Sequence, residues 1–205
     1  MDSNEGNYDM IEKAIEFATQ AHLGQFRKGT NRPYITHPLE VGEIISSMTE
    51  DQEVISAAIL HDTIEDCDWV TKKRLAEDFT PRVADLVAAK TEDMTKPWEE
   101  RKTTTIREIK RGSREVQMIE LADKLSNMRD IDRDYLEVGE DLWDRFRMKD
   151  KKIIGWYYQS IRDALSDGCV KQASKSAVAA YQEYCYLVDK YWPSQCLESE
   201  ADLVI

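Results

Sequence analysis

The sequence is short of glycine and proline, with eight and five among 205 residues. The long segments between them carry apolar residues three and four positions apart, the helical period, so we expect an all-α fold. No apolar run approaches the roughly 20 residues of a membrane-spanning helix. The first residues, MDSNEGNYDM, lack the basic end and apolar stretch of a signal peptide. We therefore expect a cytoplasmic protein that has no membrane partner.

Positive charge is also scarce, because 28 Lys and Arg stand against 40 Asp and Glu and the formal charge is −12. Such a chain has no electrostatic reason to follow a phosphate backbone, which argues against polymeric DNA or RNA and leaves a small anionic ligand as the partner. The four cysteines form no C-x-x-C pair. We interpret them as reduced thiols rather than a disulfide framework or a zinc knuckle.

The chain shows no repeat, low-complexity segment or linker, so residues 1–205 are expected to form one domain. Its core should span about residues 8–192, and residues 197–205 should be a loose tail. Thr71, Thr80 and Ser113 are expected to begin helices, and Gly112 to end one that starts at Trp98. The last two helices are predicted over residues 139–166 and 171–192.

One apolar run, Val54 to Leu60, predicts a central buried helix that ends at His61 and Asp62. In the stretch ILHDTIED these are followed by Glu65 and Asp66, which puts four ionisable side chains within six residues. Burying a carboxylate without a partner costs several kcal/mol. The cluster therefore implies a compensating cation, basic residues or an open cleft, and a divalent metal is the simplest answer.

A second cluster, LADKLSNMRD, places Asp123 and Asn127 four residues apart on one helix face. With His37 from the segment YITHP, the proposed ligands are His37, His61, Asp62 and Asp123. Two imidazoles and two carboxylates suit Mn²⁺, Fe²⁺ or Zn²⁺. The remaining histidine, His22, lies on an apolar stripe, and we expect it to have no ligand role.

The segments RKGTNRPYITHP, ILHDTIED and LADKLSNMRD occur in this order, and together they resemble the HD-type hydrolase domain of the RelA/SpoT homologues. The resemblance spans roughly residues 14–165 and is closest to the stand-alone small alarmone hydrolases. It implies an HD-domain helical bundle with a mononuclear metal site that usually holds Mn²⁺. It also implies removal of the 3′-pyrophosphate from guanosine tetra- or pentaphosphate, which gives GDP or GTP and pyrophosphate.

The resemblance also assigns roles to residues. His37, His61, Asp62 and Asp123 correspond to the metal ligands, and Glu65 and Asp66 to the acidic pair needed for hydrolysis. Arg27 and Lys28 match a segment that lies against the base, and Asn127 matches an asparagine near the ribose. The family's common threonine after Arg129 is replaced by Asp130, and a carboxylate there bears on substrate choice.

An acidic protein that holds a highly anionic nucleotide needs a local positive cleft. The sequence offers these candidates for it: Arg27, Lys28, Arg32, Lys102 and Lys124. Arg stacking would recognise the base, helped by an aromatic residue of the segment Trp156-Tyr157-Tyr158. The sequence carries no signal for an oligomeric state.

Two other functions fit the same residues. The ligand set alone also suits a phosphohydrolase that acts on the 2′-phosphate of NADPH or on a nucleoside 5′-monophosphate. A non-catalytic nucleotide-sensing module would keep the fold but would be expected to lack a ligand or the acidic pair, and neither is missing. Binuclear cyclic-dinucleotide phosphodiesterases need more than the three histidines present.

Overall fold

The structure is a computed structural model that describes residues 5–166 and 174–193. These residues are helical apart from their loops, and their extended backbone pairs only in an isolated bridge between Phe26 and Pro33. The all-α prediction is confirmed. None of the described helices is both long enough and apolar enough to cross a membrane. The helices are α1 (Glu5–Ala21), α2 (Thr36–Met48), α3 (Gln52–Ile59), α4 (Thr63–Asp66), α5 (Lys72–Asp78), α6 (Pro81–Ala88), α7 (Trp98–Arg111), α8 (Arg114–Val138), η1 (Gly139–Arg145, a 3₁₀ helix), α9 (Lys151–Ser166) and α10 (Lys175–Tyr191).

Polar caps set several helix starts. Thr71, Thr80 and Ser113 stand before α5, α6 and α8, and each side chain accepts a hydrogen bond from a backbone amide of the first turn. Such caps satisfy amides that have no partner within the helix. α7 ends at Arg111, directly before Gly112. These predicted boundaries are confirmed.

The prediction of one helix over residues 139–166 is wrong in its first part. Gly139 has a φ of +60°, which ends α8, and the short η1 follows. α9 begins only at Lys151, where the Asp150 carboxylate accepts hydrogen bonds from the amides of Lys152 and Ile153. α10 begins at Lys175, and the expected tail over residues 197–205 lies outside the described residues.

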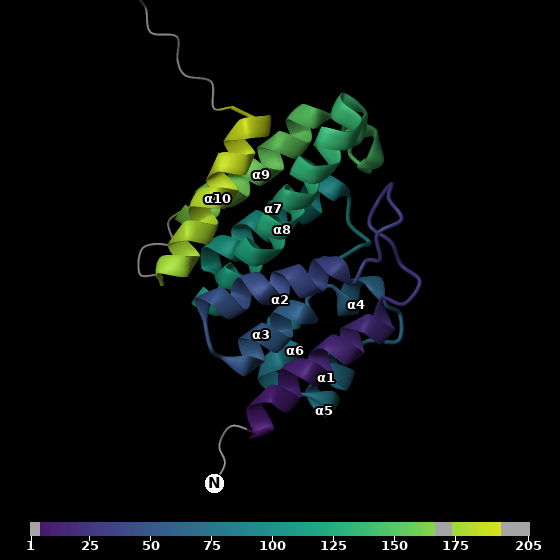
Figure 1. Cartoon of the computed structure of the whole chain (residues 1–205), viewed down its shortest axis with the longest axis vertical. Helices are drawn as coiled ribbons and strands as arrows, with labels where there is room; N and C mark the ends of the chain where they lie inside the picture. Colours follow the sequence, from purple (N-terminus) through teal and green to yellow (C-terminus); the bar gives the residue numbers. More distant parts are fainter. Residues whose placement is uncertain (1–4, 167–173, 194–205) are drawn as a thin grey trace, which may run out of the picture.

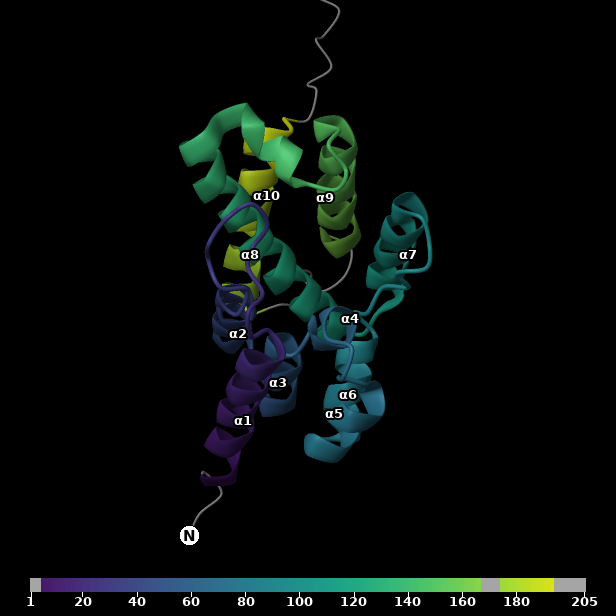
Figure 2. The same ribbon diagram turned by 90° about the vertical axis from the view of Figure 1, so that its right-hand side faces the viewer.

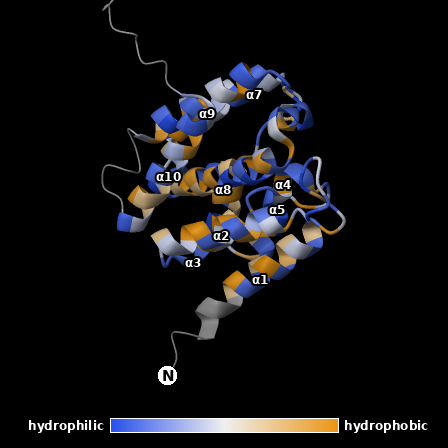
Figure 3. Ribbon diagram, turned by 45° about the horizontal axis from the view of Figure 1, so that its top comes forward, coloured by the Kyte–Doolittle hydropathy of each residue, from blue (hydrophilic) through white to orange (hydrophobic). Residues whose placement is uncertain are grey.

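α8 is the central element of the molecule. It packs against α2 on one side and α10 on the other, and it also contacts α3, α7 and α9. Its residues Leu121, Leu125 and Met128 are fully buried, and apolar segments recur along it in the hydropathy colouring (Figure 3). Helices α1 to α6 lie on one side of α8, and α9 and α10 on the other (Figures 1 and 2). Residues from both halves can therefore meet beside α8.

Candidate metal and nucleotide site

Three side chains from three elements converge beside α8. His37 lies in the first turn of α2, His61 follows α3, and Asp123 lies in α8. The Nε2 atoms of His37 and His61 lie 3.4 and 3.8 Å from Oδ1 of Asp123, and one ligand atom from each residue lies within 4.8 Å of the others. Ligands about 2.1 Å from one ion lie roughly 3 to 3.5 Å apart. The cluster therefore has the dimensions of a divalent-metal site.

Hydrogen bonds orient both imidazoles toward that point. Ser126 donates its hydroxyl proton to Glu40 (2.8 Å), so its oxygen is left to accept a proton from Nδ1 of His37 (2.9 Å). His61 donates from Nδ1 to the Ala58 carbonyl (2.7 Å). Both Nε2 atoms then carry the lone pairs that a metal needs. Nε2 of His61 is buried without a hydrogen-bond partner, so its lone pair is available to an ion bound between the three residues.

Asp62 lies beside both imidazoles but outside the group of three mutually close residues. Its Oδ2 is 3.0 Å from Nε2 of His61 and 3.7 Å from Nε2 of His37. The Tyr34 hydroxyl donates to the same oxygen at 2.7 Å. Burial, together with the charges of Asp62 and Asp66, raises the pKa of Tyr34 well above its usual value, so the phenol remains a donor.

The second oxygen of Asp123 faces two cations. Lys90 and Lys124 approach Oδ2 at 3.3 and 2.8 Å, while Asn127 donates to Oδ1 at 2.6 Å. Burial alone would raise the pKa of Asp123, but Lys124 and Lys90 hold it well below the usual range. Glu120, also buried, pairs with both lysines. Asp123 therefore stays ionised in the interior with Oδ1 directed at the histidines.

The acidic pair, Glu65 and Asp66, ends the short helix α4, which begins directly after Asp62. Glu65 and Asp66 both line the adjacent cavity, and the Asp66 amide donates to the Asp62 carbonyl at 2.9 Å. Oε2 of Glu65 accepts from the backbone amide of Glu92 at 3.2 Å. Loss of hydration in the cavity raises the pKa of Glu65 and of Asp66, and the charge of Asp62 adds to both shifts. Raised pKa values suit groups that exchange protons near neutral pH.

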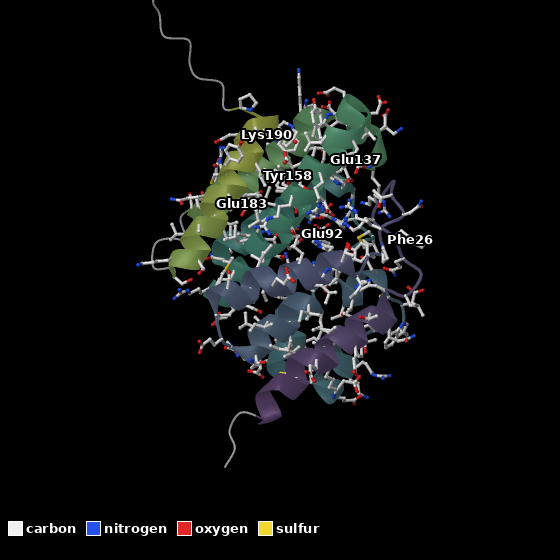
Figure 4. All side chains as sticks on the ribbon, viewed as in Figure 1. Phe26, Glu92, Glu137, Tyr158, Glu183 and Lys190 are labelled. Carbon is white, nitrogen blue, oxygen red and sulfur yellow. The ribbon has the colours of Figure 1, made fainter. Side chains whose placement is uncertain are left out.

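A cavity of about 630 Å³ opens beside the cluster. His37, Asp62 and Asp123 form one part of its wall, and residues from α7, η1 and α9 also line it. Three lining residues from different segments, Phe26, Glu92 and Tyr158, are labelled in Figure 4, where side-chain nitrogen and oxygen atoms gather near Glu92. The volume is that of a small-molecule site.

Most candidate substrate-binding residues are brought to this cavity, but several are already engaged. Arg27 donates to Asn127 and to Asp130, both at 2.7 Å. Lys102 donates to Glu92 at 2.7 Å, and Lys124 is held by Asp123. Asp130 thus meets Arg27 directly instead of facing solvent.

Two basic residues of the cavity wall are not engaged in ion pairs of this kind within the described part of the chain. Among the described residues, Lys28 and Arg147 make no ion pair although both line the cavity. Burial lowers the pKa of Lys28, and the neighbouring positive charge of Arg147 lowers it further. The charges of Asp66 and Glu65 oppose this shift, but among the described residues neither acid forms an ion pair with Lys28. Lys28 and Arg147 are therefore basic groups of the cavity wall that can meet an anion without first leaving an ion pair.

The sequence interpretation missed several lining or supporting residues. Lys90 and Glu92 lie in a connection interpreted only as polar. Arg147 lies within residues 139–166, which were predicted to be helical, but the structure places it in the loop between η1 and α9. An isolated basic or acidic residue in the sequence forms no recognisable motif, so it does not predict a place in the site. Tyr157 and Tyr158 are buried and line the cavity, whereas Trp156 is 42% exposed and does not. The three-residue aromatic segment alone did not distinguish them.

Comparison with known proteins identifies a matching family and relatives. The family profile described as "HD domain" matches residues 14–149. A guanosine-3′,5′-bis(diphosphate) 3′-pyrophosphohydrolase, MESH1 of Danio rerio, is 39% identical over 127 residues, which make up 60% of this chain and 70% of the relative.

Two solved structures share the fold. A crystal structure from Listeria monocytogenes EGD-e superposes with a TM-score of 0.69 at 32% identity and covers 77% of this chain and 99% of its own. A metazoan orthologue of SpoT, described as hydrolysing ppGpp, superposes with a TM-score of 0.72 at 24% identity and covers 90% of this chain and 97% of its own. The second match covers more of this chain than the family profile does, so the similarity of fold extends beyond the residues of the profile.

Proposed function

The chain belongs to the HD-domain family, and we propose that it hydrolyses the 3′-pyrophosphate of guanosine tetra- or pentaphosphate to GDP or GTP and pyrophosphate. One observation carries the proposal: a candidate metal cluster, an acidic pair and two cations without acidic partners face the same cavity. A phosphohydrolase needs these three elements together. The relatives named as 3′-pyrophosphohydrolases supply the substrate class.

His37, His61 and Asp123, joined by Asp62, would hold a divalent ion. We propose Mn²⁺, with Fe²⁺ and Zn²⁺ as the alternatives that the same nitrogen and oxygen donors accept. When bound, such an ion supplies Lewis acidity to water and to a phosphoryl oxygen. The hydrogen bonds to Ser126 and to the Ala58 carbonyl orient the two imidazole rings toward the ion site.

Glu65 and Asp66 would handle the protons. Water forms a bond to the phosphorus on O3′, the O3′–P bond breaks, and O3′ takes a proton as pyrophosphate leaves. Both carboxyl groups border the cavity and both have raised pKa values. They are therefore suited to orient the water and to move protons between it and the leaving oxygen.

The basic side of the cavity would bind the phosphates. Lys28 and Arg147 are the cations that need not leave an acidic partner first. Arg27, held by Asn127 and Asp130, lies 5.4 Å from the centre of the Tyr34 ring and presents an ordered guanidinium for stacking on a base. Lys102 and Lys124 would act on charge at longer range, because their ammonium groups are paired.

The test is product analysis of purified, Mn²⁺-loaded protein incubated separately with guanosine tetraphosphate, NADPH and a nucleoside 5′-monophosphate. We expect GDP and pyrophosphate from the tetraphosphate, loss of both products with EDTA, and recovery on adding Mn²⁺. Orthophosphate from NADPH or from the monophosphate, without pyrophosphate from the tetraphosphate, would contradict the proposal and favour another HD-type phosphohydrolase. No turnover of any substrate would favour a sensing module.

A further inference from the structure

His22 stands at the C-terminal end of α1, where it is 2% exposed and takes no part in the metal cluster. Its ring lies 4.8 Å from that of Tyr34 with a tilt of 35°. Nδ1 of His22 lies 2.8 Å from Oε1 of Gln25, and Nε2 is buried without a hydrogen-bond partner. A histidine that only filled the core would not need this link to Gln25, which lines the catalytic cavity.

Gln25 carries the link to the acidic pair. Its Nε2 donates to the backbone carbonyl of Asp66 at 3.1 Å. That bond fixes which end of the amide faces His22, so Oε1 must accept and Nδ1 of His22 must carry the proton. Gly24, at a φ of +81°, forms the turn that brings Gln25 back beside His22. In this turn the backbone amide of Gln25 donates to the backbone carbonyl of His22 at 3.0 Å.

The His22 ring also contacts Tyr34, which reaches Asp62 beside the metal cluster. The Tyr34 hydroxyl donates to Oδ2 of Asp62 at 2.7 Å, and its ring contacts both the His22 ring and the Arg27 guanidinium. Moving Tyr34 would change the direction of that hydrogen bond. His22 therefore contacts one residue that holds Asp66 and another that holds Asp62.

We propose that His22 is a positioning residue for hydrolysis. It orients the Gln25 amide, which fixes the backbone of Asp66, and it supports the ring of Tyr34, which fixes the carboxylate of Asp62. The inference rests on the proposed hydrolase function. It assigns His22 no proton transfer and no contact with substrate.

The first test compares His22→Asn with His22→Leu. The two side chains have nearly the same shape and both lose the imidazole ring, but the Asn amide nitrogen can replace Nδ1 as donor to Gln25. We expect His22→Leu to lower kcat on guanosine tetraphosphate by about 10- to 100-fold, with KM changed less than about threefold, because small displacements of reacting groups have effects of this size. His22→Asn should have a higher kcat than His22→Leu at the same fall in Tm, because it keeps the link to Gln25, and the loss of kcat that both variants share measures the support of Tyr34.

The second test reads the position of Asp66 without turnover. Gln25→Met keeps the length of the side chain and removes both polar atoms. Hydrogen–deuterium exchange of the Asp66 and Val70 amides, which donate to Asp62 and Cys67, should accelerate in Gln25→Met and His22→Leu but not in His22→Asn. This measurement needs no activity, and Gln25→Met serves if His22→Leu does not fold.

The outcomes separate the two proposals. A wild-type protein that does not hydrolyse the tetraphosphate contradicts the proposed function, while the exchange experiment still tests the link from His22 to Asp66. An active wild type with equal kcat in His22→Leu contradicts the positioning role. Equal losses of kcat in His22→Leu and His22→Asn would overturn the positioning of Asp66 through Gln25. Unchanged hydrogen–deuterium exchange of the Asp66 amide in Gln25→Met would contradict the role of Gln25 in fixing the backbone of Asp66.

Discussion

At the scale of single residues, the candidate metal cluster depends on side chains that do not themselves face the metal. Ser126 is fully buried in α8 and lies between Nδ1 of His37 and the carboxylate of Glu40. It thereby selects the ring orientation in which Nε2 of His37 faces Asp123. Residues of this kind are invisible to a motif search, because the serine has no metal-binding chemistry of its own.

Ser126→Ala should therefore weaken metal binding. Without the hydroxyl, His37 loses the partner that fixes its tautomer, and we expect Mn²⁺ affinity to fall about 10- to 100-fold. Isothermal titration calorimetry on the metal-free protein measures this directly. Ser47→Ala is the matched control, since that hydroxyl is exposed and donates only to the Ile44 carbonyl of its own helix. Equal affinities in the two variants would contradict the role given to Ser126.

Glu65→Gln should separate chemistry from metal binding. The substitution keeps the size of the side chain and removes its ability to exchange a proton, so kcat should fall about 100- to 10,000-fold. Mn²⁺ affinity should stay within about threefold, because Glu65 lies outside the cluster of His37, His61 and Asp123. Glu99→Gln, an exposed position in the first turn of α7, is the control and should keep full activity. Undiminished turnover in Glu65→Gln would rule out the proton-handling role.

At the scale of helices, the start of α3 depends on one carboxylate. Asp51 accepts hydrogen bonds from the amides of Glu53 and Val54, and it pairs with Arg82 of α6 at 2.8 Å. α3 is the helix that places His61, so its first turn bears on the site. The hydrogen bond from Arg82, although opposed by partial burial, holds the pKa of Asp51 below its ordinary value of 3.8.

Asp51→Ala should lower the free energy of unfolding by about 1 kcal/mol at pH 7, the usual cost of losing a cap. Asp51→Asn keeps the cap and loses the charge, so its loss should be smaller. Because the folded pKa is depressed, the charge contributes stability above pH 3.8, and this contribution disappears as pH falls from there through the folded value. Urea denaturation at pH 7 and pH 3 should show the Asn variant approaching wild type in acid. A constant difference at both pH values would contradict this account.

Helix boundaries were largely predictable, because short-range signals determine them. Thr71, Thr80 and Ser113 each cap the helix that the sequence assigns to them, and Gly112 ends α7. The order of the three motif segments also predicted the HD-domain family. These features depend on neighbours within a few residues or on a fixed local pattern.

The remaining features depend on tertiary contacts. Asp150 caps α9 only because Gly139 first turns the chain out of α8, so the apolar pattern alone extended α9 too far. His22 was assigned to an apolar stripe, which is correct for its burial, but its pairing with Gln25 and Tyr34 brings together residues from a turn and a loop. Glu92 lies in a connection that the sequence shows only as polar, and its ion pair with Lys102 forms only in the folded structure. No spacing rule predicts such pairs.

At the scale of the whole molecule, the helices beyond the family profile help to form the cavity. The profile ends at residue 149, yet Ile154, Tyr157 and Tyr158 of α9 line the cavity. Gly155 of α9 lies close against Trp192, the residue that follows α10, and the Trp192 ring also stacks on Tyr158 at 5.5 Å. The position of the cavity wall therefore depends on this contact.

Gly155→Ala tests the contact. Alanine is favoured over glycine in a helix by about 1 kcal/mol, but its Cβ would lie 2.3 Å from Cδ1 of Trp192. Overpacking of this kind typically costs about 1 to 3 kcal/mol, so we expect a net loss of stability in urea denaturation. In a Trp192→Leu background, where the obstructing ring is absent, the same substitution should be neutral or stabilising. Destabilisation of equal size in both backgrounds would show that Trp192 is not the cause.

Metal binding should stabilise the whole fold, because its candidate ligands join α2, the end of α3 and the central α8. At a free Mn²⁺ concentration of 100 times Kd, binding adds about 2.7 kcal/mol. For a chain of this size that corresponds to a rise in Tm of roughly 5 to 10 °C. If residues 1–205 form the single domain that the sequence predicts, calorimetry should show one unfolding transition, and Mn²⁺ should raise its Tm. EDTA should reverse this rise in Tm. Asp123→Asn retains the side-chain shape but weakens the ligand set, so it should lose most of the rise in Tm.

An equal rise in Tm in that variant would show that the stabilising ion binds elsewhere. Two separate unfolding transitions, of which only one responds to Mn²⁺, would contradict the coupling of the two halves of the molecule through α8.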